Sequence, residues 1–472
     1  MSRELRKRKA EQPAPSTPPP PAANGRTKSG SSKYNHKDEP VASPPRKQKT
    51  AKMITHPPTT TGQVWVVGSG DCGQLGLGPD VTEREKPAQV KFFEEKRPVM
   101  IAAGGLHNIV LTANNKLFSW GCNDHFALGR VTDSEGPRWD SEPGEVEGLD
   151  EAVITKIVCG DNCSAALTRD GNVYIWGTFR DSMGIFGATK ETSIQKTPLK
   201  LQGLHDVMDI AAGSNHMIAI TDDGKLWSWG IGEQGQLGRR LAVRQIVSSS
   251  LVPRSMTFKA PHASDKKFVG AFCGSYHTHF IPNTGRTCGV GLNQYGQIGD
   301  GSSDNTEEPV EVLAVPKVVG GAAGEHHSLF LDDQGRLWAT GRNDSGQLGY
   351  TTPVSDAAGN IDPTNAQTDR SIIPHLVDFS AYGETPPKIT SVSAGTFFSV
   401  ALSDEETNNL YTWGYGEMGQ LCNPGVDDDV LRPFRTNLNN RKVLMVSAGG
   451  QHTLMLLAPK DLEAQIQNMH VA

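Results

Sequence analysis

The chain consists largely of short apolar runs separated by polar turns. From about residue 62 onward, runs of four to six residues rich in Val, Ile, Leu and Trp alternate with Gly or Asp-Gly turns, as where Asp222–Gly224 leads into Leu226–Trp229. Runs of this length between such turns are typical of short antiparallel β-strands. The pattern therefore predicts an all-β chain with almost no helix.

One unit of this pattern repeats along the chain. The strand that carries Trp229 continues into a glycine-spaced loop, and seven such loops occur. They begin at Gly68, Gly121, Gly177, Gly230, Gly291, Gly341 and Gly414. The intervals range from 50 residues (Gly291 to Gly341) to 73 residues (Gly341 to Gly414), a period typical of propellers and other repeat arrays.

A second motif, Gly-x-x-His between two apolar runs, accompanies the loops. Its fourth position holds His107, Cys163, His216, His277, His327, Phe398 and His452. The first glycine loop has no such motif before it, and the motif at His452 has no loop after it, so these two halves should complete one unit. We therefore predict a seven-bladed β-propeller of four-stranded blades, closed by pairing of the strand near Val64–Val67 with the segment Val443–Leu457.

We interpret the repeated tryptophans and histidines as packing residues. Aromatic side chains in strands usually lie in the core, although an aromatic box for a ligand is an alternative for the tryptophans. Histidines at one repeated position favour hydrogen bonds between blades, because side chains spread around a ring cannot ligate one metal ion. We expect no metal site and no cofactor. The tryptophans in question are Trp120, Trp176, Trp229 and Trp413.

Three glycine loops match the dinucleotide-binding fingerprint, for example Gly68-x-Gly70-x-x-Gly73. That fingerprint needs a helix that begins at the third glycine within a βαβ unit, whereas the pattern here returns to a strand. No Walker lysine, nucleophile elbow or pair of carboxylates stands out either. We therefore expect neither a nucleotide site nor catalytic residues.

Charge divides the chain into two parts. Residues 1–60 carry thirteen Lys and Arg against four acidic residues and are rich in Pro, so a net charge of about −15 falls on the remainder of a chain whose total is −6. A segment of that composition cannot bury a core. We predict a disordered basic tail over residues 1–60, the propeller over residues 61–457 and a C-terminal extension over residues 458–472.

The tail holds two basic clusters of the kind found in nuclear import signals and in segments that bind nucleic-acid phosphates. A solvated tail without a partner is the alternative. Without a long apolar run or a secretory signal, the chain is expected to be intracellular and to have no membrane partner, and its seven cysteines to be reduced core thiols. The basic residues are Arg6, Lys7, Arg8, Lys9, Arg46, Lys47 and Lys49.

The repeat Leu-x-x-Trp-Gly-x-Gly-x-x-Gly-Gln-Leu-Gly, together with Gly-x-x-His over residues 62–457, resembles the regulator of chromosome condensation family. The resemblance implies a guanine nucleotide exchange factor, not an enzyme with side-chain chemistry of its own, that releases GDP from the small GTPase Ran by stabilising its nucleotide-free state. It also implies a nuclear, chromatin-associated protein that contacts importin, and nucleosome or DNA through the tail and the insert Arg239–Lys267. Because other proteins share the repeat, a non-catalytic scaffold, a ubiquitin-ligase-associated module and a photoreceptor-like protein are alternatives.

The same resemblance implies a set of site residues in loops at one rim. The segment Phe179, Arg180, Asp181, Ser182, Met183 and Gly184 adds a residue to the third glycine loop and resembles the family's protruding wedge. Carried over by position, the GTPase-binding residues are Asp71, His107, Asp161, Asn215, Arg239, His326 and His452. The chain departs from the family at Asn215, where an Asp is expected, and in the fifth loop, where Tyr295 replaces a His.

Overall fold

The computed structural model describes most of the repeat region and no part of the predicted basic tail before residue 58. The described residues are 58–132, 140–241, 249–256, 267–350, 354–355, 361–362, 369–383, 385–425 and 429–459. The predicted targeting residues Arg6, Lys7, Arg8, Lys9, Arg46, Lys47 and Lys49 lie outside these ranges, as do residues 460–472 of the predicted C-terminal extension.

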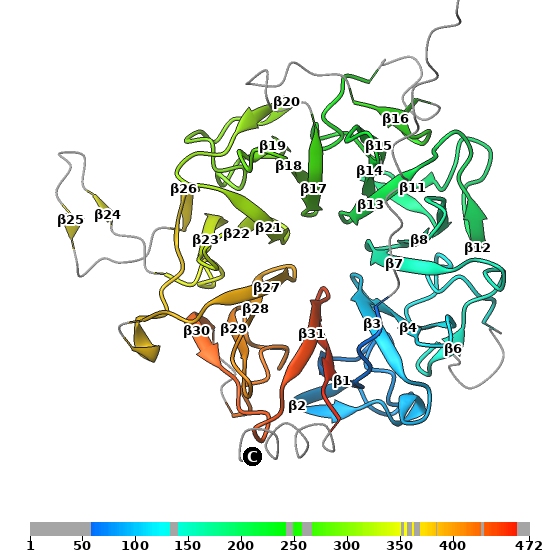
Figure 1. Cartoon of the computed structure of the whole chain (residues 1–472), viewed down its shortest axis with the longest axis horizontal. Coiled ribbons are helices and arrows are strands. Elements are labelled where there is room, and N and C mark those ends of the chain that lie inside the picture. Colours follow the sequence, from blue (N-terminus) through cyan, green and yellow to red (C-terminus); the bar gives the residue numbers. More distant parts are fainter. Residues whose placement is uncertain are drawn as a thin grey trace, which may run out of the picture. The chain divides into compact units, whose positions relative to one another are not determined.

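Seven four-stranded antiparallel sheets stand in a ring around a central axis (Figure 1). This arrangement confirms the predicted seven-bladed propeller. From the innermost to the outermost strand, blade 1 contains β3 (Pro98–Ala103), β4 (His107–Thr112), β5 (Leu117–Gly121) and β6 (Gly144–Glu145); blade 2 contains β7 (Ile154–Cys159), β8 (Cys163–Thr168), β9 (Val173–Gly177) and β12 (Gln195–Lys200); blade 3 contains β13 (Val207–Ala212), β14 (His216–Thr221), β15 (Leu226–Gly230) and β16 (Arg254–Ser255); and blade 4 contains β17 (Phe268–Cys273), β18 (His277–Pro282), β19 (Cys288–Gly291) and β20 (Thr306–Glu311).

The remaining three blades complete the ring. Blade 5 contains β21 (Val318–Ala323), β22 (His327–Asp332), β23 (Leu337–Arg342) and β26 (Arg370–Leu376); blade 6 contains β27 (Ile389–Ala394), β28 (Phe398–Ser403), β29 (Leu410–Gly414) and β30 (Val430–Arg435); and blade 7 contains β31 (Val443–Ala448), β32 (His452–Leu457), β1 (Gln63–Ser69) and β2 (Glu83–Gln89). Two hairpins project from the loops, and two 3-10 helices lie in others. These elements are β10 (Phe179–Asp181) with β11 (Gly184–Gly187), β24 (Val354–Ser355) with β25 (Ile361–Asp362), η1 (Lys91–Phe93) and η3 (Ser380–Tyr382).

Blade 7 closes the ring by joining both ends of the repeat region. Its strand β1 pairs with β32 from Gln63 opposite Leu457 to Gly68 opposite His452. The closing pairs are therefore those predicted from the two incomplete repeats. Pairing the ends in this way completes blade 7 and covers the edges that β1 and β32 would otherwise expose.

The second strand of every blade is buried along its whole length. Both faces of such a strand pack against neighbouring blades, so its sequence reads as a continuous apolar run and not as an alternating one. Outer strands have no such cover; the first four residues of β2 are exposed. The core of this protein therefore lies between blades.

A repeated set of hydrogen bonds joins adjacent blades. In blade 4, His277 Nε2 donates to Ser328 Oγ of blade 5 at 2.8 Å, and that hydroxyl donates to the Gln297 carbonyl of blade 4 at 2.7 Å. We call this the interblade relay. Equivalent imidazole contacts of 2.7 to 3.0 Å join four other interfaces, which confirms the predicted role of the histidines: His107 with Ser164, His216 with Thr278, His327 with Ser399 and His452 with Asn108.

The relay explains why its motif begins with glycine. A Cβ on Gly213 would lie 2.2 Å from Cε1 of His216, and a Cβ on Gly449 would lie equally close to His452. The imidazole ring therefore occupies the space that any larger residue would need. Each ring is fully buried and its Nδ1 has no hydrogen-bond partner, so burial favours the neutral ring with its one proton on Nε2.

The tryptophans pack across the same interfaces, as predicted. The indole N–H of Trp120 donates to the Gln74 carbonyl at 3.0 Å, and that of Trp413 to the Gln347 carbonyl at 2.9 Å. Both carbonyls belong to the glycine loop of the preceding blade. Each indole thus binds the same loop as the relay of its interface.

Two interfaces lack the relay histidine. Between blades 2 and 3, Cys163 and Met217 take the places of the imidazole and the hydroxyl, and the Trp229 indole N–H is buried without a partner. Between blades 6 and 7, Phe398 replaces the histidine, while Thr453 still donates to the Gln420 carbonyl at 2.8 Å. At the relay position the first interface is apolar, and the third glycine loop, which would supply the carbonyl, is replaced there by a hairpin.

Closure by both ends leads to a first prediction. Deleting residues 443–472 removes β31 and β32 and leaves β1 and the inner faces of two blades uncovered, so we expect no cooperatively folded protein. Circular dichroism during thermal unfolding and the yield of soluble protein measure this. A soluble truncated chain that melts in one sharp transition would contradict closure by β1 and β32.

The relay leads to a second prediction. Burial lowers the folded-state pKa of His327 to about 3 from an ordinary value of 6.5, so the unfolded chain takes up a proton first as the pH falls. The resulting stability is fully present above pH 6.5 and is lost as the pH decreases toward 3, by about 1.4 kcal/mol per pH unit. In His327→Phe, which copies the natural arrangement at Phe398, the loss between pH 7 and pH 5 should shrink by about 2 kcal/mol.

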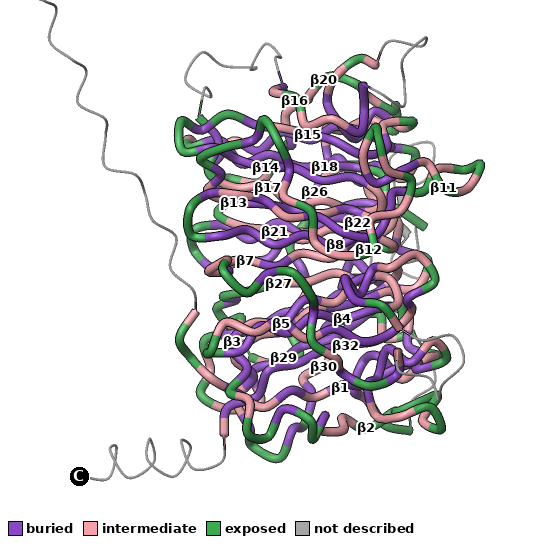
Figure 2. Tube along the Cα trace, turned by 90° about the vertical axis from the view of Figure 1, so that its right-hand side faces the viewer, coloured by how far each residue is buried: buried purple, intermediate pink, exposed green. Residues whose placement is uncertain are grey.

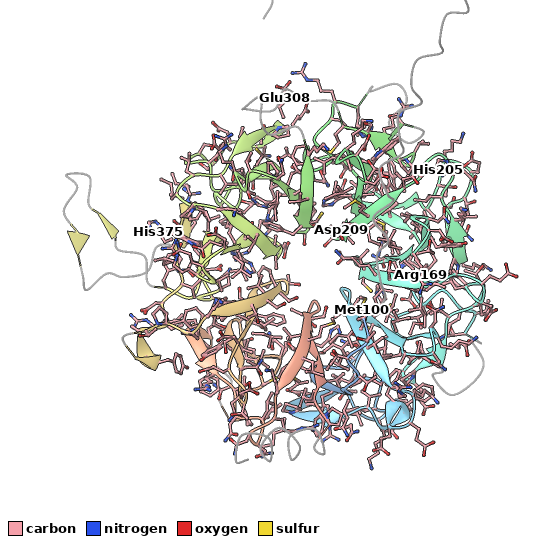
Figure 3. The ribbon with its side chains drawn as sticks, viewed as in Figure 1. Met100, Arg169, His205, Asp209, Glu308 and His375 are labelled. Atoms are coloured by element: carbon pink, nitrogen blue, oxygen red, sulfur yellow. The ribbon has the colours of Figure 1, made fainter. Side chains whose placement is uncertain are left out.

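Urea unfolding at both pH values measures this difference. The matched control is His205→Gln, at an exposed position on the periphery of the ring (Figure 3). An equal loss of stability in His327→Phe and in the unaltered chain would show that the buried imidazole is not the titrating group.

Candidate functional site

The glycine loops and the Gly-x-x-His loops lie on one face of the ring. Each second strand begins where the third strand ends, as in the pairing of His216 with Gly230. The two kinds of loop are also bonded to each other: the Ile231 amide donates to the Asn215 carbonyl at 2.7 Å, and the Thr178 amide to the Asn162 carbonyl at 2.9 Å. We call this the loop face. The closing strands enter and leave at the other face, where Gln63 pairs with Leu457.

The predicted wedge is a hairpin, β10–β11, that protrudes from the loop face (Figure 2). Its root is fixed by Phe179, which is 1% exposed and packs in the apolar interface between blades 2 and 3. Its tip is solvated, with Met183 92% exposed. The Asp181 carboxylate accepts a hydrogen bond from the Met183 amide at 2.8 Å and closes the turn. The segment is thus a preformed projection on a rigid base.

Asn215 holds the hairpin from the neighbouring blade. Its side-chain oxygen accepts a hydrogen bond from the Arg180 amide at 2.8 Å. An aspartate oxygen can accept the same bond, so the hairpin contact is compatible with either residue. The departure from the expected Asp at this position therefore preserves the acceptor and removes the charge.

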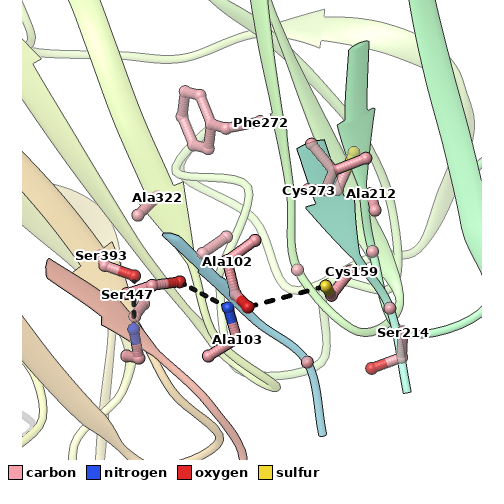
Figure 4. A pocket seen from close by; sticks show the side chains of 18 of the residues that line it. Ala102, Ala103, Cys159, Ala212, Ser214, Phe272, Cys273, Ala322, Ser393 and Ser447 are labelled. Atoms are coloured by element: carbon pink, nitrogen blue, oxygen red, sulfur yellow. Dashed lines mark hydrogen bonds between the residues drawn. The ribbon is translucent and has the colours of Figure 1, made fainter. Parts of the chain in front are cut away.

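Asp161 lies beside Asn215 at the mouth of the central cavity. The inner strands carry mostly small side chains and leave a cavity of about 380 Å³ along the axis. In the wall of this cavity, hydrogen bonds join the inner strands of neighbouring blades. For example, the Ala103 amide donates to Ser447 Oγ at 2.9 Å (Figure 4). The Asp161 carboxyl is open to solvent at this mouth but is enclosed by protein at longer range, which raises its pKa, while a hydrogen bond from Ser214 opposes the rise.

His326 and Asp71 also lie in loops of this face. The ring of His326 is half-buried, and its centroid lies 5.0 Å from that of the Tyr295 ring. Burial together with the charge of Arg342 lowers the pKa of His326 to about 4. The ring is therefore neutral at pH 7. Asp71 is exposed in the first glycine loop. Asp71, Asp161, Asn215 and His326 thus occupy the predicted face together with the hairpin.

The prediction that His107 and His452 lie in rim loops is wrong. Both residues begin second strands, both are 0% exposed, and both rings donate to the next blade. A buried ring with its N–H already bonded cannot contact a partner protein directly. These two histidines support the rim through the interblade relay.

Arg239 is also placed differently from the prediction. Its guanidinium donates to the Ser228 hydroxyl at 3.1 Å and to the Ser249 carbonyl at 3.1 Å inside blade 3, and burial lowers its pKa to about 10. Arg130, at the same repeat position in blade 1, donates to the Ser119 carbonyl in the same way. Arg239 therefore anchors its glycine loop to the outer part of its own blade.

Sequence reasoning missed an arc of aromatic residues that runs along the loop face from blade 4 to blade 6. It includes residues of three successive Gly-x-x-His motifs and of the adjoining glycine loops. In these three motifs the third position holds Tyr276, His326 and Phe397, and this repeated aromatic residue could have predicted the arc from sequence. The arc consists of Tyr276, Tyr295, His326, Phe397 and Tyr415, with Arg342 between two of the rings.

Other expected chemistry can be stated for the described residues only. They contain no group of three or more His, Cys, Asp or Glu side chains placed to hold a metal ion. All seven cysteines are free of disulfides. Among the helices of this part of the chain, none has the length and apolar character needed to cross a membrane.

The bond between Asn215 and the hairpin is the basis of a third prediction. The Asn215→Leu substitution removes the acceptor, so trypsin should cleave the hairpin after Arg180 about fivefold faster. This factor corresponds to the loss of a hydrogen bond that contributes about 1 kcal/mol. Asn215→Asp keeps an acceptor and should be cleaved at the parental rate. Limited proteolysis with identification of the fragments measures this. Equal rates for all three chains would contradict the role of Asn215 in holding the hairpin.

Comparison with known proteins identifies the family. A model of the RCC1-like domain matches residues 63–455. The Regulator of chromosome condensation of Xenopus laevis is 36% identical over 429 residues, which cover 88% of this chain and 95% of that protein. The Guanine nucleotide exchange factor SRM1 of Saccharomyces cerevisiae is 30% identical over 451 residues, covering 85% of this chain and 89% of that protein.

Solved structures agree with these relatives. The structure of Prp20p from Saccharomyces cerevisiae, which was described with its binding to Gsp1p and histones, has a TM-score of 0.75 at 28% identity and covers 89% of this chain and 97% of that one. Yeast RCC1 (Prp20) bound to Kap60 has the same TM-score at 27% identity and covers 91% of this chain and 100% of that one. The chain therefore belongs to the regulator of chromosome condensation family, whose RCC1-like domain forms its seven blades.

Proposed function

We propose that this protein is a guanine nucleotide exchange factor that releases GDP from the small GTPase Ran. The observation that carries the proposal is the hairpin β10–β11, a preformed projection at the point where the third glycine loop departs from the repeat. The relatives named as regulators of chromosome condensation and as an exchange factor support the same activity. The protein regulates a GTPase and uses no catalytic side chain of its own.

The mechanism needs differential binding and no proton transfer. The loop face binds the nucleotide-free GTPase more tightly than the loaded one, and by linkage the bound exchange factor weakens nucleotide by the same factor. The hairpin, with its exposed Met183 tip and its rigid Phe179 root, competes for the phosphate-binding region of the GTPase. A rigid projection suits this task because little of the interaction energy is lost in ordering it.

The surrounding rim supplies further contacts in this proposal. Asp71 and Asp161 place negative charge on the loop face, and the neutral imidazole of His326 offers a hydrogen bond without charge. A propeller with an excess of acidic residues attracts a basic partner surface and speeds the encounter. Asn215 acts by holding the hairpin in place.

We further propose that the protein is nuclear and associated with chromatin while it exchanges nucleotide. The basic tail would bind nucleosome or DNA phosphates and present importin with its clusters; the related Prp20 is described as binding histones and Kap60. The described part of the chain starts at the face opposite the hairpin, where Gln63 of β1 pairs with Leu457.

Two other functions remain distinguishable by experiment. A scaffold or ubiquitin-ligase-associated propeller would bind its partner without accelerating nucleotide release. A photoreceptor-like protein would need tryptophans clustered on the rim, whereas most tryptophans here, Trp139 excepted, occupy strand positions; the four repeat tryptophans are at most 1% exposed, and Trp139 lies outside the described residues. The hairpin favours the exchange factor over both.

The fourth prediction tests the hairpin. Replacing Arg180-Asp181-Ser182-Met183 by a short glycine link should lower the maximal rate of GDP release by at least tenfold while leaving the half-saturating concentration within about twofold, because an interface of about 1,600 Å² would still hold the GTPase. Release of fluorescent GDP from purified Ran over a range of exchange-factor concentrations measures both values. The unaltered chain and a control without exchange factor are run alongside.

A parental maximal rate with a raised half-saturating concentration would make the hairpin a docking contact and contradict displacement. No acceleration by the unaltered chain would contradict the exchange function itself.

The fifth prediction tests the tail. Deleting residues 1–55 should weaken binding to nucleosomes at least tenfold at moderate salt and reduce the steepness with which affinity falls as salt rises, since fewer phosphates are neutralised. It should leave GDP release from Ran unchanged. Electrophoretic mobility shifts at several salt concentrations measure this. Unchanged nucleosome affinity together with unchanged nuclear entry would remove the role proposed for the tail.

A further inference from the structure

A cavity of about 310 Å³ opens on the loop face where the loops of blades 5, 6 and 7 meet. Its walls are formed by Phe397 and Tyr415 of blade 6, Arg342 of blade 5 and Gln451 of blade 7, and Phe398 lies at its base. The rings of Phe397 and Tyr415 stand edge to face with centroids 6.5 Å apart. We call this cavity the aromatic pocket. It lies on the face that carries the hairpin.

The one cation in the wall is already neutralised. The Arg342 guanidinium stacks between two rings, with its central carbon 5.3 Å from the Tyr295 centroid and 5.2 Å from the Phe397 centroid. Its Nε also donates to the Asp344 carboxylate at 2.8 Å. Arg342 thus holds the two rings in place, and the Asp344 carboxylate compensates its charge.

Three further carboxylates interact with residues of the pocket wall or with one another beside it. Glu417 accepts a hydrogen bond from the Tyr415 hydroxyl at 2.6 Å, and Glu325 faces Arg342 from blade 5. Asp429 lies close enough to Glu417 and Asp344 that burial and their charges raise its pKa. Asp344 in the wall and three carboxylates close to wall residues thus outnumber the one guanidinium of the wall. Aromatic faces and carboxylates together favour a Lys or Arg side chain as ligand.

The repeat itself marks this pocket. Of the seven Gly-x-x-His motifs, only those with Cys163 and Phe398 lack the histidine. Cys163 lies beneath the hairpin, in the apolar interface that receives Phe179. Phe398 lies at the base of the aromatic pocket. Both departures from the relay thus lie beneath features that interrupt the regular loop face, the hairpin and the aromatic pocket.

We propose that the aromatic pocket is a docking site for a Lys or Arg side chain of the GTPase that the hairpin engages; this rests on the proposed exchange function. The pocket contacts the partner on the side of the ring away from the hairpin, so it holds the GTPase equally well with and without nucleotide. Binding that is uniform along the reaction changes the half-saturating concentration and leaves the maximal rate unchanged. Docking and displacement are therefore assigned to different parts of one face.

The test compares a variant that lacks one aromatic ring of the pocket with a variant that lacks one nearby negative charge. Tyr415→Leu and Glu417→Gln should each raise the half-saturating concentration for GDP release from Ran about tenfold, with the maximal rate kept within about twofold. The effect of Glu417→Gln should shrink at high salt, because its partner is a cation. Glu94→Gln is the control, since Glu94 is an exposed acid that follows the end of β2 at the face opposite the loop face. It should keep the parental half-saturating concentration.

Thermal midpoints of the variants show whether each one is folded, and calorimetric binding to nucleotide-free Ran gives the affinity independently of exchange. If the unaltered chain accelerates release but both variants keep its half-saturating concentration and affinity, the pocket is not the docking site. A lowered maximal rate with unchanged half-saturation also overturns the proposal, because the pocket would then act in displacement. If the unaltered chain does not accelerate release, the exchange function fails and the assignment of this partner fails with it.

Discussion

The structure depends on contacts between blades, because a single four-stranded blade cannot bury its two faces alone. Each second strand is buried on both sides, and a relay of imidazole, hydroxyl and loop carbonyl fixes how one blade meets the next. A buried hydrogen bond contributes about 1 kcal/mol, and an unpaired buried group costs more. Five relay histidines therefore specify the spacing and tilt of the blades as well as stabilising them. Placing loops accurately on the face follows from that spacing.

The two interfaces without a relay histidine lie beneath the irregular features of the loop face. Where the third glycine loop is replaced by a hairpin, its carbonyl is absent, and a histidine with a serine would be left with unpaired groups; Cys163 and Met217 avoid that cost with an apolar contact. Where Phe398 stands, the ring lies at the base of the aromatic pocket. Packing in this way couples the replacement of a relay histidine, at Cys163 and at Phe398, to the hairpin and the pocket on the surface above. This coupling is the physical reason for assigning function to these two parts of the rim.

The fold was accessible from sequence because each repeat carries its own constraints. The glycine of each motif is required by the imidazole that rests on it, and the two incomplete repeats specify the closing pairs of β1 and β32. The site was only partly accessible. His107 and His452 share a repeat with loop residues, and position in a repeat does not separate a side chain that points into the interface from one that points to solvent.

Arg239 and the aromatic arc are two further cases in which a single sequence did not predict the contacts of a side chain. Arg239 resembles a rim cation in sequence, yet its donors are used inside blade 3, as those of Arg130 are in blade 1. The rings of Tyr295 and Phe397 come from different blades, and only folding brings them to either side of Arg342. Contacts between repeats are set by the geometry of the ring, which a single sequence does not display.

The most direct test of this account is the structure of the full chain bound to nucleotide-free Ran. The GTPase should lie on the loop face, with the β10–β11 hairpin at its empty phosphate-binding region and one of its Lys or Arg side chains in the pocket between Phe397 and Tyr415. A GTPase bound to the opposite face, or one bound to the loop face with the hairpin in solvent, would contradict it.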